Sequence, residues 1–140
     1  MKKLIHSIVF ISLLLQGTAC SKKEDPVPSI VGVWRQTSQE GSGCTDPTDN
    51  FKFNCPADGP CDTYTFILEG NKFTMSNTGI DPVNPLATGT YTISGDKLIL
   101  KYDDIDYSAE SSFVLTATTL TLTRKSDSTG CTITLVYARQ

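Results

Sequence analysis

A period of two dominates the sequence from residue 30 onward. Bulky apolar residues alternate with threonine in several runs, and residues 119–123, which read TLTLT, show the pattern most clearly. Successive side chains of a β-strand point to opposite faces, so this alternation predicts strands with one buried and one solvated face. No stretch after residue 30 carries the 3.6-residue apolar period of a helix. We therefore predict an all-β fold.

Turn residues divide the pattern into eight predicted strands. Glycine stands with Asn, Asp or Ser at residues 69–71, 94–96 and 126–130, as in hairpin turns. Eight short strands joined by hairpins favour an up-and-down antiparallel β-barrel, which leaves no exposed edge, with a two-sheet sandwich as the alternative. The predicted strands cover residues 31–39, 62–68, 71–77, 88–93, 97–102, 110–116, 118–124 and 131–139.

Short and long connections alternate along the chain. The short ones, after the second, fourth and sixth strands, are 69–70, 94–96 and Ala117. The long ones, after the first, third, fifth and seventh strands, are 40–61, 78–87, 103–109 and 125–130. Alternate connections of an up-and-down barrel lie at opposite ends. We therefore expect all long loops at one end, the rim, and all tight turns at the other, the floor.

The N-terminal segment predicts export and lipidation. Lys2 and Lys3 precede an apolar run, Ile5 to Leu15, which at about 11 residues is too short to span a bilayer. Small residues then lead directly to Cys20. This arrangement resembles the lipobox of bacterial lipoproteins, in which the cysteine is acylated and becomes the new N-terminus. Gly17 stands where a lipobox usually carries a large aliphatic residue, and an ordinary secretory signal is the alternative.

The number of cysteines favours the lipoprotein interpretation. The chain has five, and acylation of Cys20 leaves an even set of four for disulfides. We assign residues 1–19 to a signal peptide, 20–29 to the lipidated cysteine and a flexible linker, and 30–140 to the folded domain. Residues 23–25, KED, resemble the signal that sends some Bacteroidetes lipoproteins to the cell surface. We expect export through the Sec route and attachment to the outer membrane, on its periplasmic or surface face, by palmitate or similar acyl chains on Cys20.

Composition excludes several classes of function. Removal of residues 1–19 takes away His6, the only histidine, and leaves 10 basic and 15 acidic side chains. An acidic surface argues against nucleic acid as a partner. Without histidine no Ser–His or Cys–His nucleophile can form, and the chain has no phosphate-binding glycine loop. We expect no enzyme activity, no cofactor and no metal, and we interpret Asp103, Asp104 and Asp106 as a solvated acidic turn.

Short motifs give the chain a family resemblance. Gly32-Val33-Trp34 resembles the G-x-W signature of lipocalins, and residues 30–34, 89–98 and 119–122 resemble the lipocalin-like domains of Bacteroidetes lipoproteins. The resemblance implies a lipocalin-like barrel over about 110 residues. In lipocalins an arginine near the end of the last strand packs across this tryptophan at the closed end. The resemblance thus places Gly32, Trp34 and Arg139 at the barrel floor.

Closure of such a barrel brings the first and last strands together and predicts the disulfides. With Trp34 beside Arg139, Cys44 approaches Cys131 at the rim, and Cys55 and Cys61 close a small loop. Of the three possible connectivities we choose 44–131 with 55–61. An oxidising compartment and the missing histidine favour disulfides over a zinc site.

The inward-facing apolar side chains leave two functions open. Eight strands enclose little more than their own side chains or one small ligand. The first hypothesis is a lipid-anchored lipocalin-like barrel that binds a small hydrophobic ligand at its open end. The second is a solid-core structural lipoprotein whose long first loop and residues 82–85 contact a surface protein or a glycan. The candidate ligand-pocket residues are Tyr64, Phe66, Phe73, Met75, Tyr91, Leu98, Leu100, Phe113 and Leu120.

Overall fold

The computed structural model describes residues 28–55, 64–77 and 85–140, which form one antiparallel sheet and a single short 3-10 helix. The predictions for residues 1–27, including the signal peptide and Cys20, lie outside the described residues. No helix in the described part of the chain is long and apolar enough to cross a membrane. The elements are β1 (Gly32–Ser42), η1 (Pro47–Asp49), β2 (Phe51–Asn54), β3 (Tyr64–Glu69), β4 (Lys72–Asn77), β5 (Ala87–Ser94), β6 (Lys97–Tyr102), β7 (Ser108–Leu115), β8 (Thr119–Lys125) and β9 (Thr132–Arg139).

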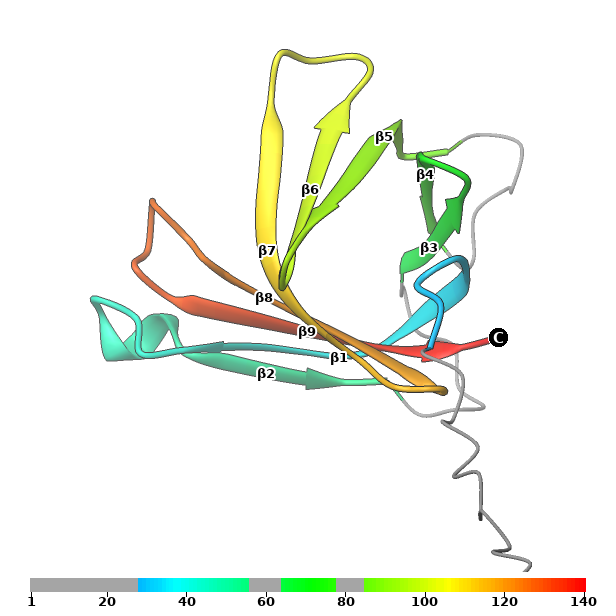
Figure 1. The fold of residues 1–140 in the computed structure, drawn as a ribbon. Helices are drawn as coiled ribbons and strands as arrows, with labels where there is room; N and C mark the ends of the chain where they lie inside the picture. The colour runs from blue at the N-terminus through cyan, green and yellow to red at the C-terminus, as the bar shows by residue number, and fades with distance from the viewer. Residues whose placement is uncertain (1–27, 56–63, 78–84) are drawn as a thin grey trace, which may run out of the picture.

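Eight of the strands close into a barrel (Figure 1). Each strand from β3 to β9 pairs with the next along the chain, and β1 pairs with both β3 and β9. The pairing of β1 with β9 runs from Trp34 opposite Arg139 to Ser42 opposite Thr132. This closure confirms the predicted eight-stranded up-and-down barrel.

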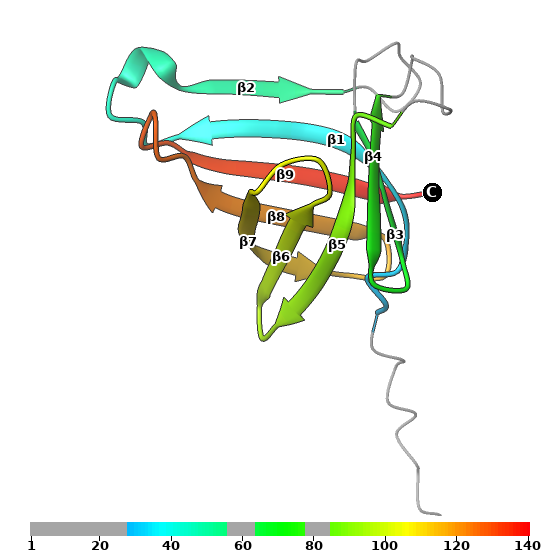
Figure 2. The same cartoon turned by 90° about the horizontal axis from the view of Figure 1, so that it is seen from above.

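The strand β2 was not predicted. Residues 40–61 were expected to form one loop, and this is wrong in part, because β1 continues to Ser42 and Phe51–Asn54 pairs with it. The first part of β1, residues 32–35, pairs with β3, and the later part, residues 38–41, pairs with β2. An irregularity between Gln36 and Ser38 marks the change of neighbour. The rim halves of β1, β8 and β9, together with β2, therefore form a sheet that extends past the barrel, as Figure 2 shows. We call this sheet the rim extension.

The two ends of the barrel differ as the connection lengths predict. The tight turns of residues 70–71, 95–96 and 116–118 lie at the same end as Ile30 and the C-terminus. Gly70 and Gly95 have positive φ angles, which glycine adopts without the steric penalty of a side chain. The longer connections that are described in full after β4, residues 103–107 and 126–131, lie at the opposite end. The barrel thus has a floor next to the start of the domain and a rim away from it.

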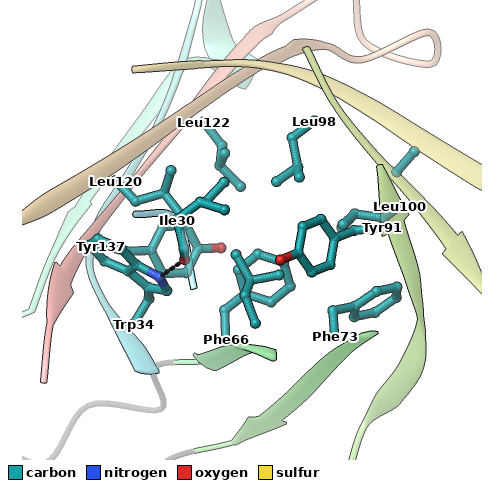
Figure 3. Packing of buried hydrophobic residues seen from close by; sticks show 12 residues of the cluster. Ile30, Trp34, Phe66, Phe73, Tyr91, Leu98, Leu100, Leu120, Leu122 and Tyr137 are labelled. Carbon is teal, nitrogen blue, oxygen red and sulfur yellow. Dashed lines mark hydrogen bonds between the residues drawn. The ribbon is translucent and has the colours of Figure 1, made fainter. Parts of the chain in front are cut away.

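The floor half of the barrel is filled by the inward-facing side chains. Trp34, Phe66, Leu68, Phe73, Leu98 and Leu120 are almost completely buried, and each apolar side chain of this size stabilises the fold by about 1.5–3 kcal/mol when buried. At Gly89 there is no room even for a Cβ atom, which would overlap the Lys101 carbonyl and the Phe73 ring. Figure 3 shows how these side chains converge from all sides of the barrel. The core is thus closely packed around Phe73.

Candidate functional site

Trp34 and Arg139 close the floor of the barrel, where they were predicted. The Trp34 ring is fully buried, and the guanidinium carbon of Arg139 lies 4.2 Å from the ring centroid. The indole Nε1–H donates a 2.8 Å hydrogen bond to the Ile30 carbonyl, drawn as a dashed line in Figure 3. A guanidinium over an indole face is a favourable cation–π arrangement. Since Trp34 and Arg139 face each other across paired strands, this contact also joins β1 to β9.

The remaining interactions of Arg139 tie the entering chain to the floor. Its Nε donates to the Ala117 carbonyl and its Nη1 to the Val31 carbonyl, both at 3.0 Å, while Nη2 donates to the Ser29 carbonyl. Gly32 allows this approach, because a Cβ atom there would lie 2.8 Å from Nη1. The Arg139 guanidinium is therefore hydrogen-bonded to protein carbonyls and stacked on the indole, and the floor has a structural role in closing the barrel.

A disulfide joins the rim ends of β1 and β9. Cys44 and Cys131 are bonded, 87 residues apart in the sequence, which confirms the predicted pair. The adjacent Thr45 N–H donates to the Thr129 carbonyl at 2.9 Å. Cys55 is also disulfide-bonded, and its predicted partner Cys61 lies outside the described residues.

A cavity of about 70 Å³ lies on the rim side of the packed core. A polar cavity holds one water when its volume reaches about 10–15 Å³, so this space is several times larger. The walls are mainly apolar, with a few polar groups from Tyr102, Ser111 and Arg124, which is the composition typical of small-molecule sites. The lining residues are Phe66, Met75, Leu100, Tyr102, Ala109, Ser111, Leu122, Arg124, Leu135 and Tyr137.

The predicted pocket residues divide between this cavity and other parts of the barrel. Phe66, Met75 and Leu100 line the cavity. Phe113 lines a separate hollow of about 460 Å³ at the floor end. The side chain of Tyr64 lies outside the described residues. The others belong to the buried core and do not line the cavity: Phe73, Tyr91, Leu98 and Leu120.

Above the cavity the barrel opens into a cleft of about 780 Å³. The cleft forms because β7 pairs with β8 only from Ser112 onward, so that the β6–β7 hairpin diverges from the β8–β9 hairpin (Figure 1). One wall comes from residues 107–110, and the other from the rim extension, including Gln39, Phe51 and Ile133. Small-molecule sites in proteins commonly measure about 300–1,000 Å³. We call this cleft the mouth.

Arg124 lies where the mouth meets the cavity and lines both. It continues the inward series of Leu120 and Leu122 on β8, and stands opposite the buried Ile133 of β9. Burial raises the pKa of Tyr102, and the nearby positive charge of Arg124 acts in the opposite direction. Our sequence interpretation missed Arg124 because it followed only apolar residues. The two-residue spacing from Leu122 was the signal that could have identified it.

The acidic turn between β6 and β7 makes local contacts. The Thr88 hydroxyl donates to an Asp103 carboxylate oxygen at 2.9 Å. Within the described ranges, no group of three or more His, Cys, Asp or Glu side chains is placed to hold a metal ion.

Comparison with known proteins identifies one family. The model of the lipocalin-like domain matches residues 30–122, more than half of the chain, from two residues before β1 into β8. Searches of curated proteins and of solved structures gave no significant match. The segment beyond the match contains β9, which the structure shows to complete the barrel.

Proposed function

The chain belongs to the lipocalin-like domain family, and we propose that it binds a small, largely apolar molecule through the mouth of its barrel. The observation that carries this proposal is the cavity inside the barrel, which shares Ala109 and Arg124 with the mouth. Since Trp34 and Arg139 seal the floor, the mouth gives the cavity its access. The proposed role is binding without catalysis.

The cavity walls suit an apolar occupant. Phe66, Leu122 and Leu135 supply apolar surface from three different strands. Transfer of apolar surface out of water contributes about 25 cal/mol per Å², so even a modest ligand gains affinity from these walls. The narrow cavity takes one end of the molecule, and the wider mouth takes the rest.

A neutral fluorescent probe tests ligand binding. We expect N-phenyl-1-naphthylamine to gain fluorescence with the wild-type domain, and Ala109→Leu to weaken its binding about tenfold, because the longer side chain fills the cavity. The control is Ala117→Leu, which adds the same side chain to an exposed floor turn. Titration of the probe against each variant, with thermal unfolding to verify folding, gives the result. Absence of binding to the wild type, or equal binding to both variants, would contradict this proposal.

The proposed location is the outer membrane, with Cys20 acylated. Arg139 holds the Ser29 and Val31 carbonyls at the floor, so the chain enters the barrel there. The linker of residues 21–29 reaches at most about 30 Å, at about 3.3–3.6 Å per residue. An anchor at Cys20 would therefore keep the floor near the bilayer and turn the mouth away from it.

Cell fractionation tests this location. We expect the full-length protein to enter the membrane fraction and to incorporate a palmitate analogue, and Cys20→Ser to lose both properties because the acyl chains have no attachment site. Ser21→Ala, next to the anchor, serves as the control and stays in the membrane. Protease treatment of intact cells then separates the surface from the periplasmic face. Membrane association of Cys20→Ser would contradict lipid anchorage.

A second candidate function follows from exposed aromatic side chains. Phe51 and Phe53 on the edge strand β2 are 42% and 43% exposed. An exposed aromatic pair on a strand at the edge of the described sheet favours contact with a protein or glycan. This second function is favoured if the neutral probe fails to bind. Phe53→Ser leaves the cavity unchanged, so it distinguishes contact through β2 from ligand binding in the cavity.

A further inference from the structure

The barrel has an arginine at each end, Arg139 at the floor and Arg124 at the mouth, and their side chains differ in the number of contacts that they make with other protein groups. Arg139 at the floor donates to three carbonyl oxygens and stacks on Trp34. The side chain of Arg124 at the mouth forms no hydrogen bond and no ion pair with any described residue. Although Arg124 is exposed, its side chain lines both the apolar cavity and the mouth. A cation in this position without a protein partner is available to a ligand.

Two hydroxyl groups line the same cavity. Tyr102 on β6 and Ser111 on β7 face it from the wall opposite β8, and neither hydroxyl makes a hydrogen bond to a described residue. A hydroxyl donates one hydrogen bond, and a guanidinium offers five N–H donors in a planar fork that matches an oxyanion. Tyr102, Ser111 and Arg124 can therefore all donate hydrogen bonds to a ligand in the cavity.

The other charges around the mouth do not neutralise Arg124. Glu110 on the outer face of β7 pairs with Lys97 at 3.2 Å. Asp127 lies in the β8–β9 loop, and Lys125 adds a second positive charge beside Arg124. On a domain with more acidic than basic residues, the mouth therefore keeps free positive charge at the entrance to its apolar cavity.

We infer that the ligand is an amphiphile with an anionic oxygen-rich head, a carboxylate or sulfonate, bound by Arg124 with Tyr102 and Ser111, and an apolar body in the cavity. This inference rests on the proposed function and names the ligand class. Charge-assisted hydrogen bonds to guanidinium are about twice as strong as neutral ones. Arg124 thus selects anionic amphiphiles over neutral ones of equal size.

A matched pair of probes tests the head group. 1-Anilinonaphthalene-8-sulfonate is N-phenyl-1-naphthylamine with one added sulfonate, so the two differ in the anionic group alone. We expect Arg124→Gln to weaken binding of the sulfonate about tenfold and to leave binding of the neutral probe unchanged. Lys101→Gln, which removes an exposed charge from the outer face of β6, should change neither. Decanoate should displace the sulfonate more effectively than decanol.

The outcomes separate this inference from the function on which it rests. If Arg124→Gln weakens both probes equally, or leaves the sulfonate unaffected, Arg124 does not bind the head group and the inference is wrong, although the barrel still binds apolar ligands. If the neutral probe fails to bind the wild type, the proposed function itself fails. Binding of the neutral probe by Arg124→Gln also shows that the variant is folded.

Discussion

Replacing Cys44 and Cys131 together with alanine is expected to lower the free energy of unfolding by about 4.5 kcal/mol. The disulfide links residues 87 apart, so in the unfolded chain it closes a loop that includes most of the barrel. Closure of a long loop removes conformational entropy from the unfolded state, and this loss increases with loop length. The bond also joins β1 to β9 at the rim, where the barrel closes.

A second cysteine pair provides the control. Urea unfolding of the double-alanine variant gives the change in free energy relative to wild type. Cys55 and its predicted partner Cys61 are six residues apart, and for a disulfide between them the same entropy relation gives only about 2 kcal/mol for replacing both. Removal of the long link should therefore lower the free energy of unfolding about twice as much as removal of the short one. Equal losses would contradict the entropic origin, and no loss from Cys44→Ala with Cys131→Ala would show that strand pairing alone closes the barrel.

Much of the fold could be predicted because the alternation carries two kinds of information. Leu120 and Leu122, separated by threonines, indicate both a strand and the face that it buries. The lengths of the connections then distinguish floor from rim. The strand β2 was missed because Phe51 and Phe53 give only one repeat of the alternation, surrounded by Pro, Asn, Asp and Cys. A strand of four residues carries too short a pattern to stand out.

The cavity was harder to predict, because alternation gives the face of a residue but not its depth along the barrel. Leu98 and Leu100 occupy the same face of β6 and both belong to the buried core, yet only Leu100 lines the cavity. The depth depends on strand register and on where neighbouring strands separate, and both are tertiary properties. Arg124 escaped notice because charged residues are seldom expected on an inward face.

Trp34→Ala is expected to destabilise the domain by about 4 kcal/mol. The substitution removes the largest fully buried side chain and leaves a cavity at the floor. It also removes the indole donor to the Ile30 carbonyl and the ring beneath Arg139. Trp34→Phe keeps an apolar ring and should therefore lose less, and Val33→Ala, on the neighbouring exposed position, should change stability by only about 0.5 kcal/mol.

The contribution of the cation–π contact can be isolated with a double-mutant cycle. Trp34→Leu, which removes the aromatic ring, Arg139→Ala and the double variant, each unfolded in urea, should give a coupling energy of about 0.5–2 kcal/mol, because the Arg139 guanidinium lies over the Trp34 ring. The hydrogen bonds from Arg139 to the Ala117 and Val31 carbonyls are lost equally in both backgrounds, so they cancel from the coupling. A coupling near zero would mean that Arg139 seals the floor through these carbonyls, and that the indole acts by its volume alone.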